Sequence, residues 1–432
     1  MQNIELSPDQ QRAFTAVHRG RNLFLTARAG AGKSFLINHI IATSKKQPLL
    51  CASTGIAAIL IGGRTLHSQF KISFEQDARE SAAAISGKRE YEIRTAKILI
   101  IDEVSMVSDK LLDCVSDICK LVRKKPLLPF GGLQIIVCGD FLQLPPVFRG
   151  ENADGKYCIH AKSWQEARIE PIMLTTNFRQ GHDNAFYDIL TRIRYDCVNQ
   201  KVVDLLKSRD VEPGENTIRL YSTNNEVDAY NQKMYCKLDS KTEKKYNMLI
   251  YGEPAYVNNF LKNSLYAQEL LFRKNARVIL IANLEIDDVY LCNGSLGTLV
   301  GYDDGFPRVR FDCGVTETIT IYTTSQKEKS YNENGEIVYG DELLHVEQIP
   351  LKLAWAVSIH KSQGQTFDNA YIDCLRVFAF GQIYVALSRV KSLDGIYIKN
   401  FDIRRSLCEP TMVDWYIELE KKAKELSPCK PE

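Results

Sequence analysis

Five short runs of apolar, often β-branched residues alternate with helical or loop patterns in the first part of this chain. They lie at residues 21–27, 48–53, 97–102, 133–140 and 171–176. Uninterrupted apolar runs of this length are typical of strands covered on both faces, which is the environment of a parallel sheet. The first half of the chain is therefore predicted to be an α/β domain.

The second half repeats this pattern and then departs from it. Apolar runs that predict a second α/β domain lie at residues 217–222, 276–282, 352–358, 369–374 and 395–400. Between residues 296 and 350 the strands become short and alternating, and the pair Asn334-Gly335 favours a tight hairpin turn. This interruption predicts a small β-barrel insert. Residues 411–426 have the pattern of an amphipathic terminal helix.

Composition and charge place the chain among large globular proteins. Its 432 residues are 45% hydrophobic and 25% charged, which suits two or more packed domains and argues against disorder. The formal net charge is only +2, so any attraction to nucleic acid must come from a local groove. The 12 cysteines include no C-x-x-C pair, and we expect reduced thiols. No run approaches the roughly 18–20 apolar residues of a membrane span, so we expect a soluble protein that is not secreted.

The stretch A-R-A-G-A-G-K-S at residues 27–34 has the character of a phosphate-binding loop between a strand and a helix. Gly30 and Gly32 let backbone N–H groups turn toward phosphate oxygens, Lys33 reaches the β- and γ-phosphates, and Ser34 can bind Mg²⁺. The first expected glycine is replaced by Ala27. That alanine would cost at most about 1–2 kcal/mol, and only if its backbone were left-handed.

An acidic pair supports this interpretation. Asp102 and Glu103 end an apolar strand, where the first carboxylate can hold Mg²⁺ through water and the second can orient or deprotonate an attacking water. Taken alone, such a pair is more often a solvated pair of acids at the start of a helix. Together with the loop at residues 27–34, it predicts nucleotide hydrolysis.

Three further side chains are candidates for the same site. Gln143 follows another apolar strand and can sense a γ-phosphate, although in isolation it would be ordinary turn material. Arg179 follows the strand at 171–176, and Arg389 lies in a largely apolar stretch. Each arginine alone could equally be a surface or ion-pair residue. As a pair they would act as arginine fingers, worth about 10³- to 10⁵-fold in rate. Because no N-K-x-D stretch is present, a GTPase switch is disfavoured.

These segments together resemble the petite-integration-frequency (PIF) helicases, which are superfamily-one DNA helicases close to the RecD type. The resembling segments follow the family order over about residues 6–400: LSPDQ (6–10), AGAGKS (29–34), ASTGIAAILIGGRTLHS (52–68), IIDEVSM (100–106), the stretch 103–125, GDFLQLPPV (139–147), NFRQ (177–180), the stretch 274–302, SIHKSQGQTF (358–367) and QIYVALSRVKS (382–392). Ala27 is a departure from the family pattern.

The resemblance implies an α/β fold with two RecA-like parallel-sheet P-loop NTPase domains, a wedge insert and an SH3-like β-barrel insert. The implied limits are 1–68 and 96–180 for the first RecA-like domain, 69–95 for the wedge insert, 181–295 and 351–405 for the second RecA-like domain, 296–350 for the barrel insert and 406–432 for the C-terminal helix.

The resemblance also implies roles for particular residues. Gln10 would read the adenine of ATP, and Gly364 would border the same cleft. Phosphate and nucleotide contacts would come from Ala29, Gly30, Ala31, Gly32, Lys33, Ser34 and Phe35, with Ser34 and Asp102 holding Mg²⁺. Single-stranded DNA would contact Thr54, Thr65 and His67 of the first domain and His360, Lys361 and Ser362 of the second. Each histidine could equally make a structural hydrogen bond.

The implied activity is ATP-dependent 5′-to-3′ translocation on single-stranded DNA with duplex unwinding. In the wedge, Ile72 or Phe74 would cap the exposed base at the fork, and a core role for Phe74 is an equal alternative. Expected partners are single-stranded and forked DNA, with an RNA–DNA hybrid or a quadruplex as further possibilities, and the expected state is a monomer without membrane contact. Translocation on RNA and a nucleotide-dependent DNA-binding scaffold with weak turnover are the alternative functions. The expected compartment is the cytoplasm for a bacterial or phage protein, and the nucleus or mitochondrion for a eukaryotic one.

Overall fold

A computed structural model describes most of the chain. The described residues are 6–28, 31–43, 48–54, 57–58, 61–72, 78–146, 156–176, 184–214, 217–263, 266–282, 284–286, 289–291, 295–331, 337–363, 365–405 and 407–425. The chain divides into two compact units. Unit 1 comprises Met1–Val203, Val377–Ser388 and Asp402–Glu432, and unit 2 comprises Asp204–Arg376 and Arg389–Phe401.

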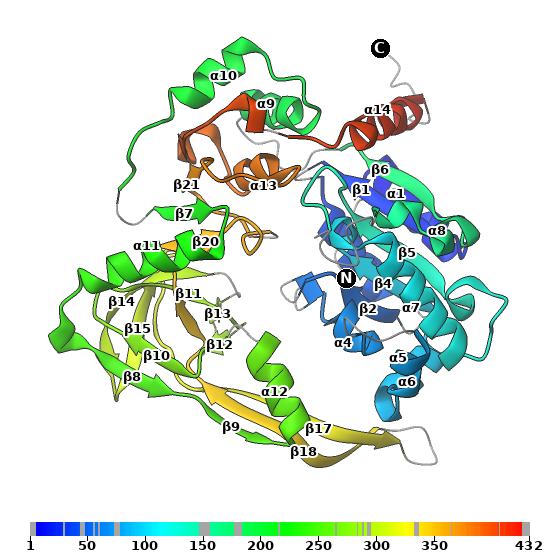
Figure 1. Ribbon diagram of the computed structural model, residues 1–432, viewed down its shortest axis with the longest axis horizontal. Coiled ribbons are helices and arrows are strands. Elements are labelled where there is room, and N and C mark those ends of the chain that lie inside the picture. Colours follow the sequence, from blue (N-terminus) through cyan, green and yellow to red (C-terminus); the bar gives the residue numbers. More distant parts are fainter. Residues whose placement is uncertain are drawn as a thin grey trace. The chain divides into compact units, whose positions relative to one another are not determined.

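Unit 1 is built on a parallel sheet of six strands in the order β3-β2-β4-β5-β1-β6 (Figure 1). The strands are β1 (Leu23–Ala27), β2 (Pro48–Ala52), β3 (Arg64–Thr65), β4 (Ile98–Asp102), β5 (Gln134–Gly139) and β6 (Glu170–Leu174). Neighbouring strands in this sheet all pair in parallel. The five predicted strands of the first domain are thereby confirmed, and only the two-residue strand β3 was missed.

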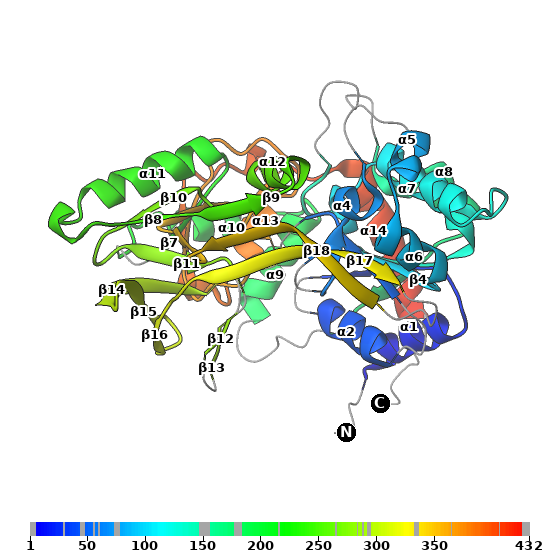
Figure 2. The ribbon, with the colours of Figure 1, turned by 90° about the horizontal axis from the view of Figure 1, so that it is seen from below.

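Helices cover both faces of this sheet because alternate strand residues point to opposite sides. Leu23 and Leu25 pack in a cluster with α1 (Pro8–His18) and α2 (Lys33–Thr43), which lie side by side in Figure 2. Phe24 packs on the other face with α7 (Asp109–Val122), α8 (Lys162–Glu166) and α14 (Pro410–Glu425). The predicted C-terminal helix is therefore confirmed, and it belongs to the core of unit 1 rather than to an appendage.

The region predicted as a wedge contains short helices in its described part. These are α4 (Leu66–Phe70), α5 (Ala78–Ala83) and α6 (Gly87–Thr95). Ile72 is partly buried against the core cluster of unit 1, which favours a packing role for its side chain. Phe74 lies outside the described residues, so its place at a fork remains a prediction.

Three more helices remain among the described residues of unit 1, of which α10 (Gln200–Lys207) crosses the boundary between the two units at Val203–Asp204. Helix α9 (Asn184–Arg194) contacts α13 (Gln382–Ser388), whose residues are all buried, and α10 follows α9 in the chain. No helix among the described residues is long and apolar enough to cross a membrane. The ten cysteines that the structure describes are all free thiols.

Unit 2 has its own parallel sheet, in the order β20-β7-β21-β22. The strands are β7 (Ile218–Tyr221), β20 (Ala356–Ser358), β21 (Ala370–Asp373) and β22 (Ile396–Lys399), and their pairings are parallel. Helix α11 (Asn224–Cys236) packs against β7 and β20. Both units therefore have the α/β architecture that the apolar runs predict.

One predicted strand belongs to a different sheet. The run at 276–282, expected in the parallel sheet, contains β11 (Arg277–Leu280), which pairs antiparallel with β14 and β19. The prediction of its sheet was wrong because a fully buried antiparallel strand carries the same continuous apolar run as a parallel one. All four residues of β11 are buried.

Antiparallel sheets make up the rest of unit 2. A five-stranded sheet runs β16 (Thr316–Thr318), β15 (Phe306–Phe311), β14 (Leu296–Asp303), β11 and β19 (Leu351–Leu353). A second one joins β17 (Tyr322–Tyr331), β18 (Ile337–Gln348) and β9 (Leu249–Gly252). The described part of unit 2 also contains the two-stranded antiparallel sheets β8–β10 (Lys244–Asn247, Glu269–Phe272) and β12–β13 (Leu284–Ile286, Val289–Leu291) and helix α12 (Pro254–Asn263).

The predicted barrel insert is only partly tested by these sheets. Tyr331 pairs with Ile337 across the β17–β18 hairpin, as the Asn334-Gly335 signal predicts, although that turn itself lies outside the described residues. Figure 1 shows the long β17–β18 ribbon in yellow. The order of the five-stranded sheet does not return on itself among the described strands, so an SH3-like closed barrel stays a prediction.

Candidate nucleotide site and strand-binding residues

The phosphate loop leaves the sheet through Ala27. This residue ends β1, pairs with Leu174 and is buried. It is absent from the described residues with positive φ, whereas Gly32 has φ 74°. The left-handed turn that needs glycine is therefore at Gly32, and an alanine at the strand end fits without backbone strain. Ala29 and Gly30 lie outside the described residues.

Helix α2 begins directly after this turn. Leu36 N–H donates to the Gly32 carbonyl oxygen at 3.0 Å, which closes the first helical turn. Ala31 is buried, while Ser34 and Phe35 are exposed on the first turn of α2. The hydroxyl of Ser34 is thus accessible at a helix N-terminus, where backbone N–H groups attract anions.

Lys33 meets the acidic pair at the end of β4. Its Nζ lies 3.6 Å from Asp102 Oδ1 and 4.0 Å from Glu103 Oε1. Burial disfavours the charged ammonium, but Glu103 and Asp102 outweigh that effect and raise the pKa of Lys33 above its usual value. Two carboxylates face one ammonium here, which leaves one negative charge for a cation to balance.

A strained turn presents the second carboxylate. Glu103 has φ 51° and ψ 45°, a left-handed conformation that is rare for residues other than glycine. Its N–H donates to Asp102 Oδ1 at 2.8 Å, and Ser53 Oγ donates to its carbonyl oxygen at 2.7 Å. Strain of this kind, of about 1–3 kcal/mol, concentrates at functional sites. The local hydrogen bonds hold Glu103 in this unusual conformation.

Gln143 follows β5, which lies between β4 and β1 in the sheet. Its N–H donates to the Asp140 carbonyl oxygen at 2.9 Å, and Leu142 N–H donates to Asp140 Oδ1 at 3.1 Å. The Gln143 side chain is largely buried. The loops after β1, β4 and β5 therefore open at one edge of the sheet, where open α/β sheets bind ligands.

Gln10 provides a buried side-chain amide with a hydrogen-bond donor that is available to a ligand. It belongs to a capping box at the start of α1, in which Ser7 N–H donates to Gln10 Oε1 at 3.1 Å. Gln10 is 1% exposed, and its Nε2 has no hydrogen-bond partner among the described residues. A buried amide donor without a partner costs about 1–3 kcal/mol, so it is a suitable donor for a ligand atom.

Asp9, beside Gln10, was missed by the sequence reasoning. Its carboxylate accepts from the N–H groups of Thr175 and Thr176, at the end of β6. Burial would raise the pKa of Asp9, but the hydrogen bonds from Ser7, Thr175 and Thr176 outweigh it and lower the pKa. The segment LSPDQ contained the signal, because an aspartate in the first turn of a helix is a typical N-terminal partner.

Arg389 belongs to unit 2. It is 8% exposed, and its Nη1 donates to the Gln365 carbonyl oxygen at 3.3 Å. Its own carbonyl accepts from Phe367 N–H at 2.8 Å. Arg179 and Gly364 lie outside the described residues, so the meeting of either arginine with the phosphate loop remains a prediction.

The candidate strand-binding residues of unit 1 lie at or just after the ends of β2 and β3. Thr54 Oγ1 accepts from Ala57 N–H at 3.3 Å, and Thr65 Oγ1 caps helix α4 by accepting from Ser68 N–H at 3.2 Å. His67 is exposed on α4. Both threonine hydroxyls therefore also order the local backbone, which would position backbone N–H groups for phosphate contacts.

Their counterparts in unit 2 follow β20. Lys361 is exposed and His360 is partly exposed. Ser362 is fully buried, and its Oγ donates to the Ile359 carbonyl oxygen at 2.8 Å. The Ser362 hydroxyl thus supports the turn, and contact with a strand would fall to His360, Lys361 and the backbone.

Known proteins similar to this chain match it over nearly its whole length. The family described as PIF1-like helicase matches residues 5–201. The ATP-dependent DNA helicase Pif1 of Bdellovibrio bacteriovorus is 32% identical over 96% of this chain and 93% of that protein. The ATP-dependent DNA helicase PIF1 of Xenopus laevis is 35% identical over 97% of this chain. The chain spans 65% of the length of the Xenopus protein.

Solved structures of Pif1 helicases are also similar to this chain. The Pif1 helicase of Candida albicans has a TM-score of 0.81 and 31% identity, with 96% of this chain and 100% of that chain covered. A Bacteroides Pif1 in complex with ADP-AlF3 and single-stranded DNA has a TM-score of 0.72 and 30% identity, with 97% and 98% covered. The two parallel sheets match the two RecA-like domains of these helicases. From its sequence, its fold and the geometry of its phosphate loop, this chain belongs to the PIF1-like helicase family.

Proposed function

We propose that this protein is an ATP-dependent DNA helicase that translocates 5′ to 3′ on single-stranded DNA and unwinds duplexes. The observation that carries the proposal is the placement of Lys33 Nζ between Asp102 Oδ1, at 3.6 Å, and Glu103 Oε1, at 4.0 Å. A loop lysine facing two acids at the carboxyl edge of a parallel sheet is the arrangement that nucleotide hydrolysis requires. Similarity to helicases named as ATP-dependent supports the same activity.

ATP would bind with its base near α1 and its phosphates at the start of α2. Gln10 Nε2, which has no hydrogen-bond partner among the described residues, would donate to a ring nitrogen of adenine. Lys33 and the backbone from Ala29 to Ser34 would hold the phosphates. The Bacteroides relative crystallised in complex with ADP-AlF3 supports nucleotide binding by this chain.

Mg²⁺ fits the donors that face the phosphate site. The Ser34 hydroxyl and the Asp102 carboxylate are oxygen ligands of the kind Mg²⁺ prefers. Among the residues that the structure describes, no group of three or more His, Cys, Asp or Glu side chains could hold a metal by itself. In nucleotide sites Mg²⁺ is usually bound by one or two carboxylates together with substrate phosphates and water. When bound, Mg²⁺ would neutralise charge on the β- and γ-phosphates.

Hydrolysis would use the remaining side chains of the site. Glu103, held in its left-handed turn, would orient the attacking water and accept its proton. Gln143 would contact the γ-phosphate from the loop after β5. Arg179 and Arg389 would supply positive charge to the transition state, worth about 10³- to 10⁵-fold in rate in comparable NTPases. Hydrolysis would then depend on the second domain closing on the first.

Translocation would couple that closure to a grip on DNA. Thr54, Thr65 and His67 lie at or just after strand ends of unit 1, and His360 and Lys361 follow a strand of unit 2. Contacts to phosphates from such positions hold a strand without reading its sequence. Alternate tightening of the two grips during an ATP cycle would move the protein along the strand. The Bacteroides relative bound to single-stranded DNA supports this track.

The test is unwinding of duplexes that carry either a 5′ or a 3′ single-stranded tail. We expect wild type to unwind only the 5′-tailed duplex and Lys33→Ala to unwind neither. Lys162→Ala is the matched control, because the Lys162 side chain is 82% exposed and forms a surface ion pair with Glu166. Equal unwinding of the 3′-tailed duplex would overturn the polarity. Equal stimulation of ATP turnover by RNA would favour an RNA translocase, and DNA binding with negligible turnover would favour a scaffold.

A further inference from the structure

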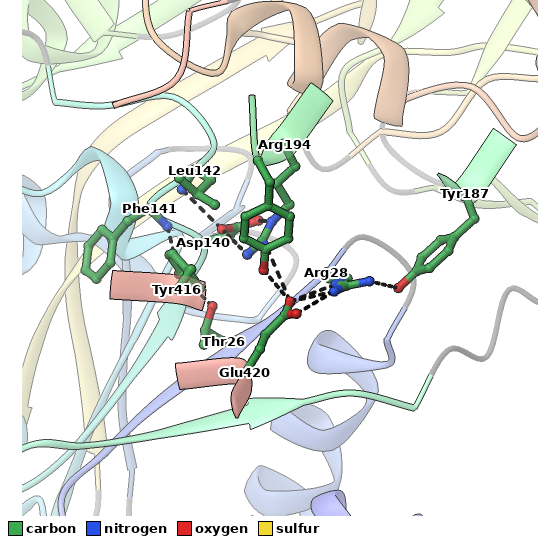
Figure 3. Close-up of polar contacts among 10 residues, drawn as sticks. Thr26, Arg28, Asp140, Phe141, Leu142, Tyr187, Arg194, Tyr416 and Glu420 are labelled. Atoms are coloured by element: carbon green, nitrogen blue, oxygen red, sulfur yellow. Dashed lines mark hydrogen bonds and ion pairs between the residues drawn. The ribbon is translucent and has the colours of Figure 1, made fainter. Parts of the chain in front are cut away.

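The phosphate loop is tied to the C-terminal helix by a charged pair. Arg28, the first residue after β1, donates to both carboxylate oxygens of Glu420 in α14: Nη2 lies 2.6 Å from Oε2 and 2.7 Å from Oε1, and Nε lies 2.9 Å from Oε1 (Figure 3). The two residues are 392 positions apart in the chain. A forked arginine–carboxylate contact of this kind fixes orientation as well as distance.

Glu420 is also held from a second direction. Tyr195, which follows α9, donates its hydroxyl to Glu420 Oε1, and Arg28 Nη1 lies 3.3 Å from the Tyr187 hydroxyl. The side chain of Glu420 is 14% exposed. Burial would raise the pKa of Glu420, but the hydrogen bonds from Arg28 and Tyr195 outweigh it and lower the pKa. Glu420 therefore stays ionised and keeps the Arg28 guanidinium engaged.

One turn earlier, the same helix reaches the loop of Gln143. Tyr416 is fully buried, and its hydroxyl lies 2.8 Å from Thr26 Oγ1 on β1. The same hydroxyl accepts from Phe141 N–H at 3.0 Å. Helix α14 thus contacts both the strand that enters the phosphate loop and the loop that carries Gln143, as Figure 3 shows.

A buried ion pair connects the loop that carries Gln143 with the Arg28–Glu420 contact. Arg194 Nη2 lies 2.9 Å from Asp140 Oδ1, Arg194 Nε lies 3.1 Å from Asp140 Oδ2, and both side chains are 1% exposed. Arg194 Nη1 is also 3.9 Å from Glu420 Oε1. Two arginines and two acids balance in charge, so removal of one leaves a buried charge without compensation. We call Arg28, Asp140, Arg194, Tyr416 and Glu420 the α14 anchor.

We infer that Glu420 is a positioning residue for ATP: through Arg28 it fixes the entry of the phosphate loop, and through the α14 anchor it links that loop to the segment carrying Gln143. This inference rests on the proposed nucleotide site, but it does not depend on DNA unwinding. The described polar contacts of Glu420 are with Arg28, Tyr195 and Arg194. Its effect is to hold the loop in its binding conformation before ATP arrives, which lowers the ordering cost of binding.

The test compares Glu420→Gln with Glu418→Gln, its exposed neighbour on the same helix. The readouts are KM for ATP, kcat, and the Kd of a fluorescent ADP measured without DNA. We expect Glu420→Gln to weaken ADP binding and raise KM by about 10-fold, with kcat changed by less than about 3-fold. Glu418→Gln should match wild type in all three.

Two additional measurements keep the inference falsifiable. A double-mutant cycle combines Arg28→Gln with Glu420→Gln. The double variant should bind ADP no worse than the more damaging single variant, because all three variants lose the same Arg28–Glu420 contact. Circular dichroism and Tm must show a folded Glu420→Gln protein. A lower Tm with unchanged ADP affinity would overturn the positioning role, as would additive effects in the cycle. Because ADP binding is the readout, failure of unwinding by wild type would count against the helicase proposal alone.

Discussion

Gly381 lies directly against the backbone of Gln143. A Cβ added to Gly381 would stand 2.6 Å from the Gln143 carbonyl oxygen and 2.5 Å from that of Leu142. Gly381 immediately precedes α13, the helix after which Arg389 follows in the chain. The candidate γ-phosphate sensor and the segment leading to the candidate arginine finger therefore touch within unit 1 through a residue without a side chain.

This contact predicts that Gly381→Ala both destabilises the protein and slows ATP hydrolysis. Its φ of +67° costs an alanine about 1–2 kcal/mol, and the close contact must also displace the Gln143 loop. We expect a loss of about 2–4 kcal/mol in unfolding free energy and at least a 10-fold lower kcat. Gly305→Ala separates the causes, because it has φ +88° with nothing within 4 Å. If both variants lose equal activity, the contact with Gln143 has no functional part.

The acidic pair predicts a clean separation of binding from hydrolysis. Glu103→Gln keeps the shape of the side chain but cannot accept the proton of the attacking water. We expect kcat to fall by about 10²- to 10⁴-fold while ADP affinity changes by less than about 3-fold. Single-turnover ATP hydrolysis and ADP titration measure the two effects. A Glu103→Gln protein with near wild-type turnover would remove Glu103 from the mechanism.

The end of β1 predicts that the unusual alanine is functionally neutral. Ala27 lies in a paired strand and lacks the left-handed backbone that needs glycine. Ala27→Gly should therefore leave ATP turnover within a few-fold of wild type and cost about 0.5–1 kcal/mol of stability, because glycine is more flexible in the unfolded chain. Denaturant unfolding and steady-state ATPase assays check both. A large gain in turnover would show that the methyl group restrains the loop.

The lowered pKa of Asp9 predicts that its contribution to the free energy of unfolding is lost at acidic pH. Its pKa is lowered in the folded protein from the ordinary value of 3.8. A lowered folded pKa means that the stabilisation is complete above the unfolded pKa and is lost as pH falls through the folded pKa. Asp9→Asn should thus have a lower Tm than wild type at pH 7, and the gap should narrow below about pH 4. A gap that is constant from pH 7 to pH 3 would show that the Asp9 charge is not the cause.

Sequence reasoning succeeded where a local pattern carries the structure. The strands near Ala27, Asp102 and Gln143 can each be recognised in the sequence as a continuous apolar run. The polar residues that end these runs mark the edge of the sheet where a ligand would bind. It failed for β11, because burial on both faces erases the difference between parallel and antiparallel pairing. Local patterns give the elements and the first layer of the site, but not every sheet partner.

The α14 anchor was outside the reach of sequence reasoning. Arg28 and Glu420 have no local motif, and an arginine inside a phosphate loop is expected to face the phosphate rather than a distant helix. Their contact spans 392 positions and exists only after the sheet and α14 have packed. The amphipathic pattern of residues 411–426 predicted the helix, but not which of its polar residues would be turned inward.

The position of α14 in the chain has a consequence for how the protein is made. A ribosome synthesises α14 after every described strand of the two parallel sheets, so Tyr416 and Glu420 are the last residues of the α14 anchor to be made. Until α14 has emerged and packed, Arg28 and Thr26 lack these two partners, and the inferred positioning of the phosphate loop cannot yet operate.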